Sequence, residues 1–326
     1  MNSEKIQLAD IYAAQRKIAD LIKHTPLIVS ESLRQFKDSE IYYKPEFLQN
    51  TGSFKIRGAA NFALSLKDEN LSRGLVTYST GNHGRAVSYV ARELGTEARV
   101  CLSNNVPENK KKGIKRAGGN LVVHGCSQDE AQIMAEEISE QEGRALVPPF
   151  DHPDIIAGQG TIGLEIIKEL PELDSIIVPV SGGGLIGGIA LAVKSINPEC
   201  KVYGVSMEKG AAMYESLQAG EPVQVEEAAT YADSLQGGIL LDNKYTYSLV
   251  KKYVDEIVLV TEEEIGKSMT EMLYKDHLVI EGAAAVGHAA LRAGKISLSQ
   301  SQTVLIASGK NLENQELYEA AERKYN

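Results

Sequence analysis

Residues 175–188 of this 326-residue chain read SIIVPVSGGGLIGG. The run 175–180 is apolar and rich in β-branched side chains, which predicts a strand buried on both faces. Glycines follow it at once, and the apolar pattern that continues to residue 195 predicts a helix. A strand that ends in a glycine loop and leads into a helix is typical of a parallel α/β fold, in which that loop faces a ligand.

The same alternation of strand and helix extends to both sides of this stretch. On the N-terminal side, strands are predicted at 75–78, 98–102, 121–124 and 145–147, and helices at about 83–94, 108–117 and 129–142. On the C-terminal side, strands are predicted at 201–205, 256–260 and 303–307, and a capping-box pattern, TEEE at 261–264, opens a helix. Residues 40–44 are a further candidate strand. Such alternation implies right-handed crossovers and parallel sheets.

The two series predict two open parallel-sheet α/β domains. We expect residues 1–71 and 147–326 to form a large domain that binds a cofactor, because the N-terminal segment lies outside both series. Residues 72–146 would form a small α/β domain inserted in it. The active site is then expected in the cleft between the two domains.

Composition narrows the class of protein. Hydrophobic residues make up 43% of the chain and charged residues 24%, as in an ordinary globular protein. The formal net charge of −10 leaves no basic excess to neutralise phosphates, so we expect no nucleic-acid partner. The three cysteines lack metal-ligand spacing, and their small number fits a reducing compartment. The N-terminus is polar and no apolar run is long enough to span a membrane, so we expect a cytoplasmic protein with no membrane partner.

The glycine loop predicts an anion site. Backbone N–H groups at 182–184, together with the N-terminus of the following helix, form a cradle for a phosphate. Gly182, Gly184 and Gly187 also fit the G-x-G-x-x-G pattern of dinucleotide-binding folds, with Glu208 near the position of the ribose-binding acid. An NAD-dependent oxidoreductase is therefore an alternative, and a third reading is that the glycines only allow close helix packing.

Lys55 lies in the run TGSFKIRGA at 51–59. Burial among apolar neighbours lowers the pKa of a lysine, because it disfavours the charged form, and a neutral amine forms a Schiff base with an aldehyde. The alternative is structural: Ser53 would cap a helix whose first turn holds Lys55 and Arg57. Cations at a helix N-terminus oppose the macrodipole, however, unless they meet an anion.

A third polar loop reads STGNHG at 79–84 and follows a predicted strand, at the edge where open α/β sheets bind ligands. Its hydroxyl, amide and backbone N–H groups suit a carboxylate. Taken singly, Thr80 or Asn82 would be a helix N-cap, and His83 would be a first-turn histidine with a local partner.

Five motifs occur in order along the chain: SFKIRG at 53–58, STGNH at 79–83, AGQGT at 157–161, GGGL at 182–185 and SGKN at 308–311. A reactive lysine, a phosphate cradle and a carboxylate-binding loop together indicate a pyridoxal phosphate enzyme that acts on an amino acid. On these motifs nearly the whole chain resembles the threonine dehydratase and serine racemase family. That resemblance implies the tryptophan synthase β-like fold of the fold type II pyridoxal phosphate enzymes.

The resemblance also implies roles for individual residues. Lys55 would carry pyridoxal 5'-phosphate through a Schiff base, with Phe54 packed near the ring. Asn82 would bond the ring hydroxyl and Ser308 would face the pyridine nitrogen. The phosphate would be held by Ser181, Gly182, Gly183, Gly184 and Leu185. A neutral serine cannot keep the ring nitrogen positive, so the ring is a weak electron sink and rapid loss of a β-substituent is favoured.

The expected reaction is therefore α,β-elimination from a β-hydroxy amino acid such as L-threonine or L-serine, which yields a 2-oxo acid and ammonia. Lys55 is the expected base for the Cα proton. The substrate carboxylate would be bound by Ser79, Thr80, Asn82 and His83. The chain is thus expected to be a threonine/serine ammonia-lyase of amino acid catabolism, and the resemblance implies a homodimer.

Departures from the family's motifs refine this expectation. Serine racemases carry a serine on the face opposite the lysine, where this chain has Thr80; its hydroxyl would still relay a proton, but its methyl crowds that face. Elimination is therefore favoured, and racemisation is the alternative. Ser206 and Ala212 stand where the racemase metal site has carboxylates, so no metal is expected.

Two further differences concern the cofactor's surroundings and the substrate. Lys310 replaces the usual glycine of the last motif and would add positive charge near the cofactor's edge. Residues 232–238 (ADSLQGG) and 241–245 (LDNKY) look like the dehydratase branch associated with hydroxyectoine utilisation, whose substrate need not be threonine.

Overall fold

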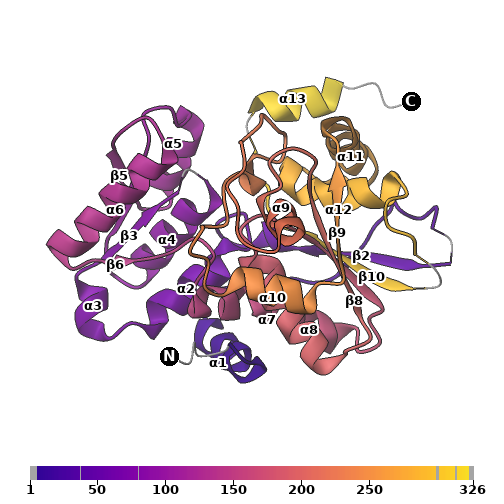
Figure 1. Cartoon of the computed structure of the whole chain (residues 1–326), viewed down its shortest axis with the longest axis horizontal. Coiled ribbons are helices and arrows are strands. Elements are labelled where there is room, and N and C mark those ends of the chain that lie inside the picture. The colour runs from indigo at the N-terminus through magenta and orange to yellow at the C-terminus, as the bar shows by residue number, and fades with distance from the viewer. Residues whose placement is uncertain (1–5, 37, 80, 299–300, 313, 323–326) are drawn as a thin grey trace.

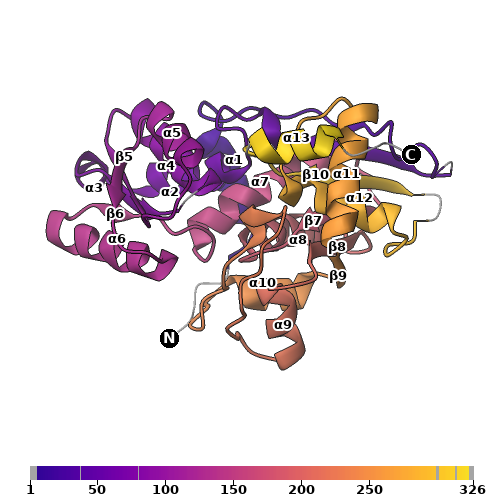
Figure 2. The ribbon, with the colours of Figure 1, turned by 90° about the horizontal axis from the view of Figure 1, so that it is seen from above.

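The computed structural model describes residues 6–36, 38–79, 81–298, 301–312 and 314–322 (Figure 1). Its strands form two sheets, which we call the large sheet and the small sheet. Seen from above, the elements of the two sheets form two groups side by side (Figure 2). The predicted α/β architecture with two sheets is confirmed.

The large sheet has six strands in the order β1-β2-β10-β7-β8-β9. Their bounds are β1 (Ile28–Val29), β2 (Glu40–Pro45), β7 (Ser175–Pro179), β8 (Lys201–Met207), β9 (Glu256–Val260) and β10 (Gln302–Ala307). All neighbours are parallel except β1 and β2, which are antiparallel. Every residue of β7 is buried, as its apolar run predicted.

The small sheet has four strands in the order β5-β4-β3-β6, all parallel. Their bounds are β3 (Leu75–Tyr78), β4 (Ala98–Leu102), β5 (Asn120–Val123) and β6 (Ala145–Leu146). All four lie within the range 72–146 expected for an inserted domain. The carboxyl ends of parallel strands share one edge of a sheet, so the loop after β3 and the loop after β4 open on the same side.

Helices connect the strands of both sheets. Their bounds are α1 (Leu8–Ile18), α2 (Lys55–Ser65), α3 (Asp68–Ser72), α4 (Asn82–Glu93), α5 (Glu108–Arg116), α6 (Gln128–Glu142), α7 (Pro153–Glu169), α8 (Gly184–Ile196), α9 (Ala212–Ala219), α10 (Thr246–Tyr253), α11 (Glu262–Lys275), α12 (Gly282–Arg292) and α13 (Asn314–Glu322), with 3-10 turns η1 (Glu46–Leu48) and η2 (Asp233–Leu235). The capping box predicted before α11 is present, since Thr261 and Glu264 each bond the other's backbone N–H. None of the helices described is long and apolar enough to cross a bilayer.

Helices α7 and α8 pack closely beside the large sheet because glycines remove the side chains at their contact. A Cβ on Gly188 of α8 would collide with the carbonyl oxygen of Ile156, and a Cβ on Gly160 of α7 would come 2.9 Å from the carbonyl oxygen of Gly188. Gly188, the last glycine of the run 182–188, therefore serves helix packing, as the third interpretation of this run proposed.

Helix α2 joins the two sheets. Its apolar face, which includes Ile56, Ala59 and Phe62, belongs to the same hydrophobic cluster as Val87 of α4 and Leu75 of β3. Residues before 72 thus contribute to the core beside the small sheet, in addition to two smaller clusters that the strands and helices of residues 76–146 form among themselves. The helix that begins at Lys55 is consequently held from both sides of the cleft.

A buried ionic network fixes the first turn of α2. The guanidinium of Arg57 donates to Glu46 at 2.8 Å from both Nε and Nη2, and to Glu165 at 2.6 Å from Nη1. Lys44 pairs with Glu165 at 2.8 Å, and all four side chains are at most 3% exposed. A cation near a helix N-terminus opposes the macrodipole, and these carboxylates offset that cost.

Candidate active site

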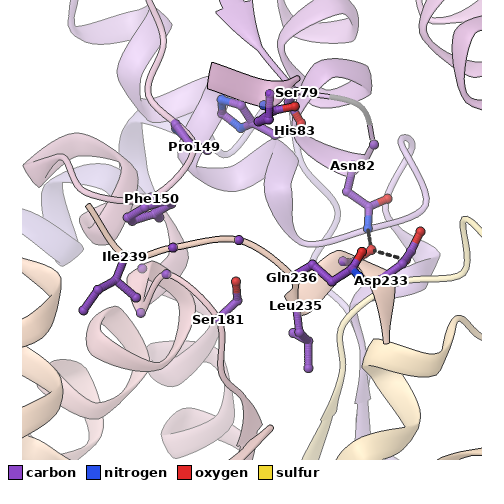
Figure 3. A pocket seen from close by; sticks show the side chains of 18 of the residues that line it. Ser79, Asn82, His83, Pro149, Phe150, Ser181, Asp233, Leu235, Gln236 and Ile239 are labelled. Carbon is purple, nitrogen blue, oxygen red and sulfur yellow. Dashed lines mark hydrogen bonds between the residues drawn. The ribbon is translucent and has the colours of Figure 1, made fainter. Parts of the chain in front are cut away.

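The described residues enclose a cavity of about 880 Å³ between the two sheets. That volume suits a small organic ligand. Its wall contains Lys55 at the start of α2, the loop after β3, the glycine loop after β7, the segment 223–241 and the end of β10. Figure 3 shows Ser79, Asn82 and His83 on one side of the cavity and Ser181 on the other. Segments far apart in the sequence therefore meet here.

Lys55 is the first residue of α2, and its side chain reaches the cavity wall. Its Nζ donates to the carbonyl oxygen of Pro149 at 2.8 Å and lies 5.3 Å from the centre of the Phe54 ring. Burial lowers the pKa of Lys55 to about 8, while the negative charge of Glu281 acts in the opposite direction. A substantial fraction of this amine is neutral near pH 8 and able to act as a base or a nucleophile.

The alternative interpretation of this segment, a helix capped by Ser53 with Arg57 in its first turn, is wrong about Ser53 and right about Arg57. Ser53 does not cap α2, because the N-cap position is Phe54 and no side chain caps the helix there. Arg57 does lie in the first turn, where it meets the carboxylates of Glu46 and Glu165. The helix start is thus stabilised by the ionic network, and Lys55 remains free of any ion pair within the described residues.

The glycine loop turns from β7 into α8 beside the cavity. Gly183 has φ +86°, a left-handed conformation that only glycine adopts without strain, and it is the N-cap residue of α8. A Cβ on Gly182 would come 2.5 Å from the ring of Phe150. These glycines therefore serve both the turn and the close approach of Phe150, and they line the cavity at the start of α8.

The loop after β3 supplies Ser79, Asn82 and His83 to the cavity wall, while Thr80 lies outside the described residues. Asn82 is the first residue of α4, whose N-cap is Gly81, so Asn82 is not the N-cap. His83 Nε2 lies 3.1 Å from the carbonyl oxygen of Val147. Burial and the nearby Lys55 lower the pKa of His83 to about 3, so its imidazole is neutral at physiological pH.

The last motif brings Ser308 to the cavity, directly after β10. The carbonyl oxygen of Ser308 accepts from the N–H of Phe54 at 3.1 Å, and Gly309 forms a bridge with Ser53. The side chain of Lys310 is exposed and does not line the cavity. The expectation that Lys310 adds charge at the cofactor's edge is therefore wrong, because its backbone is bound to Gly52 and its side chain points into solvent.

Two buried polar atoms of residues that line the cavity lack a protein partner among the described residues. They are His83 Nδ1 and Gln159 Oε1. An unpaired buried polar group costs about 1–3 kcal/mol, so such groups are rare unless a ligand satisfies them. Gln159 belongs to the motif at 157–161, which predicts no role for this residue, and it faces the cavity from α7.

Sequence reasoning missed several residues of the cavity wall. Glu281 precedes α12 and binds Asn82, while Lys110 of α5 pairs with Asp233 of η2 across the cavity's opening. Phe150 lies against the glycine loop (Figure 3). No local sequence pattern predicts a role for these residues, because their partners lie in segments that are distant in the sequence.

The two positions considered for a metal do not carry ligands. Ser206 Oγ donates to the carbonyl oxygen of Val180 at 3.0 Å, and Ala212 begins α9. Within the described part of the chain, no cluster of three His, Cys, Asp or Glu side chains has the arrangement of a metal site.

Comparisons with known proteins agree with this geometry. Residues 18–309 match the family model described as "Pyridoxal-phosphate dependent enzyme". The L-threonine ammonia-lyase of Thermotoga maritima is 41% identical over 94% of this chain and 76% of the relative. The catabolic L-threonine dehydratase TdcB of Escherichia coli strain K12 is 39% identical over 94% of each chain.

The fold is also shared with solved structures. The structure of maize serine racemase superposes with a TM-score of 0.90 at 33% identity and covers 96% of each chain. The family model spans most of the chain, and the relatives match nearly its full length. Together they exclude the alternative of an NAD-dependent oxidoreductase. The chain is a member of the pyridoxal-phosphate dependent enzymes, with the fold type II architecture of that family's threonine dehydratases and serine racemases.

Proposed function

We propose that this enzyme eliminates water from a β-hydroxy amino acid, L-threonine or L-serine. Hydrolysis of the unsaturated product takes up one water again and gives a 2-oxo acid and ammonia. The observation that carries the proposal is the Lys55 amine, whose pKa is lowered to about 8 in a cavity that also contains a glycine loop and the polar loop 79–83. A base, an anion cradle and a carboxylate-binding loop are the three parts that such a reaction needs. The relatives named for threonine dehydration support the choice of substrate.

The residues around the cavity fit pyridoxal phosphate. The glycine loop has the backbone conformation of an anion cradle, and Gly183 has the positive φ that this conformation requires. The unpaired atoms of His83 and Gln159 offer hydrogen-bond partners to polar ligand atoms. We assign the cofactor's phosphate to Ser181, Gly182, Gly183, Gly184 and Leu185, its ring hydroxyl to Asn82, its ring nitrogen to Ser308 and its ring face to Phe54.

When bound, pyridoxal phosphate acidifies the Cα–H bond of an amino acid joined to it. Lys55 is then the residue whose Nζ accepts the Cα proton, because its lowered pKa keeps part of the amine neutral at physiological pH. Its contact with the Pro149 carbonyl oxygen orients the amine in the cavity wall. Phe54 and Phe150 cover apolar parts of the cavity and limit the access of water.

The loop 79–83 would hold the substrate's carboxylate. Backbone N–H groups at the start of α4, together with Ser79, Thr80 and Asn82, are donors suited to an anion. His83 is neutral and fixed to Val147, so it contributes a dipole and not a charge. Binding the carboxylate here would place the substrate between this loop and Lys55.

The decisive experiment uses purified protein loaded with pyridoxal phosphate. We expect a yellow protein that releases 2-oxo acid from L-threonine or L-serine, and Lys55→Ala should abolish both the absorption band of the bound cofactor and the activity. Lys310→Ala is the matched control, because this lysine is exposed and lies outside the cavity. A colourless protein, or a Lys55→Ala variant with full activity, would refute the proposal.

Racemisation is the second candidate, and the similarity to maize serine racemase favours it. The ratio of 2-oxo acid to D-serine formed from L-serine separates the two activities. We expect elimination to dominate because Thr80 stands where racemases have serine. A panel of other β-hydroxy amino acids tests the substrate implied by the resemblance to the hydroxyectoine-utilisation branch.

We further propose that residues 1–71 with 147–326, and residues 72–146, are the two domains, and that the enzyme is a cytoplasmic homodimer. The separate large and small sheets support the division. Light scattering of the purified enzyme measures the number of subunits, and a monomer at working concentration would contradict the dimer.

A further inference from the structure

Glu281 is more deeply buried than the other acidic side chains of the cavity wall. It is 3% exposed, whereas Asp129 and Glu227 are exposed and Asp233 is half-buried. Glu281 occupies the N-cap position of α12 but makes no side-chain capping bond with that helix. Its carboxylate is instead available to neighbours in the cleft.

Those neighbours come from distant segments of the chain. Asn82 Nδ2, at the start of α4, donates to the carboxylate at 2.9 Å from Oε1 and 3.1 Å from Oε2. The backbone N–H of Asn311 donates to Oε2 at 3.0 Å. The hydroxyl of Ser234 in η2 lies beside this pair, where it accepts from Asn82 Nδ2 at 3.4 Å and donates to Asp233 at 3.2 Å. One carboxylate thus binds elements from both sides of the cavity.

Both ends of the Asn82 amide are held. Its Nδ2 donates to Glu281, and its Oδ1 accepts from Asn311 Nδ2 at 2.6 Å. The amide therefore cannot rotate to exchange its oxygen and nitrogen without breaking both bonds. An NH₂ group carries two hydrogens, and beside Glu281 the only other acceptor among the described residues is Ser234 Oγ at 3.4 Å, a long contact that a ligand oxygen would replace.

Glu281 is also tied to the segment that carries Lys55. A Cβ on Gly309 would come 2.7 Å from Glu281 Oε1, so only a glycine allows this approach. Gly309 bridges to Ser53, and the N–H of Lys310 donates to the carbonyl oxygen of Gly52 at 3.0 Å. The loop that presents Ser308 is thereby locked between Glu281 and the residues that precede Lys55.

We propose that Glu281 is a positioning residue for the cofactor. Glu281 fixes Asn82, which faces the ring hydroxyl, and through the 309–311 segment it fixes Ser308, which faces the ring nitrogen. This inference rests on the roles of Asn82 and Ser308 proposed above. Burial raises the pKa of Glu281 to about 7, against the hydrogen bond from Asn82. Its charge also raises the pKa of Lys55, so the carboxylate is coupled electrostatically to the reactive amine.

The test is the affinity of the cofactor-free enzyme for pyridoxal phosphate, measured by absorbance titration. In Glu281→Gln an NH₂ group replaces one acceptor oxygen and faces donors of Asn82 or Asn311. We expect the dissociation constant to rise about 10- to 100-fold, since a hydrogen bond to a charged group contributes about 1.5–3 kcal/mol. The absorption maximum of the bound cofactor should also shift.

Glu271→Gln is the matched control. Glu271 is a buried carboxylate of α11 that pairs with Lys275 and Arg292 and does not line the cavity. We expect this control to lower the melting temperature of the cofactor-free protein without changing its affinity for pyridoxal phosphate. Glu281→Asp, which keeps the charge but retracts it by one methylene, gives the same test if Glu281→Gln does not fold.

Three outcomes of this titration decide whether Glu281 positions the cofactor. Weaker cofactor binding in the Glu281 variants, with normal binding in the Glu271 control, supports the positioning role. Binding within two-fold of wild type in the Glu281 variants overturns it, even if they melt at a lower temperature, because Glu281 would then be structural only. If the wild-type protein itself binds no pyridoxal phosphate, the proposed function fails and this inference fails with it.

Discussion

Lys110 and Asp233 form an ion pair across the opening of the cavity. Lys110 belongs to α5 beside the small sheet, Asp233 belongs to η2 beside the large sheet, and 123 positions separate them in the sequence. Both side chains are partly exposed, and both line the cavity. The pair therefore connects the two walls of the cavity.

This relationship predicts that Lys110→Met raises the KM for substrate. A partly exposed pair contributes roughly 1 kcal/mol, which corresponds to about a five-fold change. The effect should be smaller at high salt, which already screens the pair. Steady-state kinetics at low and high ionic strength measure it. Lys111→Met is the control, since Lys111 pairs with Glu108 of its own helix, and equal KM changes in both variants would contradict a role for the cross-cavity pair.

Gly183→Ala should weaken cofactor binding and lower stability. Alanine at φ +86° costs about 1–2 kcal/mol, and the new Cβ would also come 2.7 Å from Met213 Cε. Gly220→Ala is a matched control with the same φ of +86° but no atom within 4 Å of the added Cβ. Urea unfolding and a pyridoxal phosphate titration compare the two. Equal losses of cofactor affinity would show that the glycine loop has no special role.

The pH dependence of cofactor binding should follow the Lys55 amine. Its pKa in the folded protein is about 8, below the ordinary value of 10.5, so the neutral fraction rises with pH and reaches one half near pH 8. The rate at which the cofactor-free enzyme combines with pyridoxal phosphate should rise through the same range. Glu281→Gln removes a charge that raises this pKa, so its midpoint should move to lower pH. A midpoint above pH 10 in wild type would refute the shift.

The same lowered pKa has a consequence for stability. Between pH 8 and 10.5 the unfolded chain binds more protons at Lys55 than the folded protein does, so this group makes the cofactor-free fold more stable as the pH rises. We therefore expect Lys55→Met to raise the free energy of unfolding at pH 7 more than at pH 10, as measured by urea unfolding.

Arg57→Met should destabilise the cofactor-free protein by about 3–5 kcal/mol, because it leaves the buried carboxylates of Glu46 and Glu165 with too few cations. Arg57→Lys should recover only part of this loss, since an ammonium cannot bind both carboxylates with a planar fork. Urea unfolding measures both variants. Arg34→Met, which breaks an exposed pair with Glu31, is the control and should change stability by less than about 1 kcal/mol.

The sequence predicted the strands well wherever an apolar run was continuous. The bounds of β3, β4 and β9 agree with the predicted ranges, and β7, β8 and β10 differ only at their ends. β1 was not predicted, because two residues, Ile28 and Val29, cannot display a period. The first turn of α2 was misjudged at Ser53, where tertiary contacts of Arg57 stabilise the helix start instead of a cap.

Local sequence cannot reveal a site residue whose role depends on distant partners. Lys55, Asn82, Ser308 and the glycines were found because each lies in a motif with its own local pattern. Glu281 stands 199 positions from Asn82, and nothing in its surroundings, IEGAAA at 280–285, distinguishes it from an ordinary helix start. The topology of the two sheets brings them together, and no local pattern encodes that proximity.

The position of β10 in the large sheet has a consequence for synthesis of the protein. β10 lies between β2 and β7, so β2 joins the parallel strands of the large sheet only after residues 302–307 have been made. The strands of the small sheet, from residues 75 to 146, leave the ribosome long before that point. The wall of the cavity includes Ser308, which directly follows β10, so the cavity is complete only once nearly the whole polypeptide has been translated.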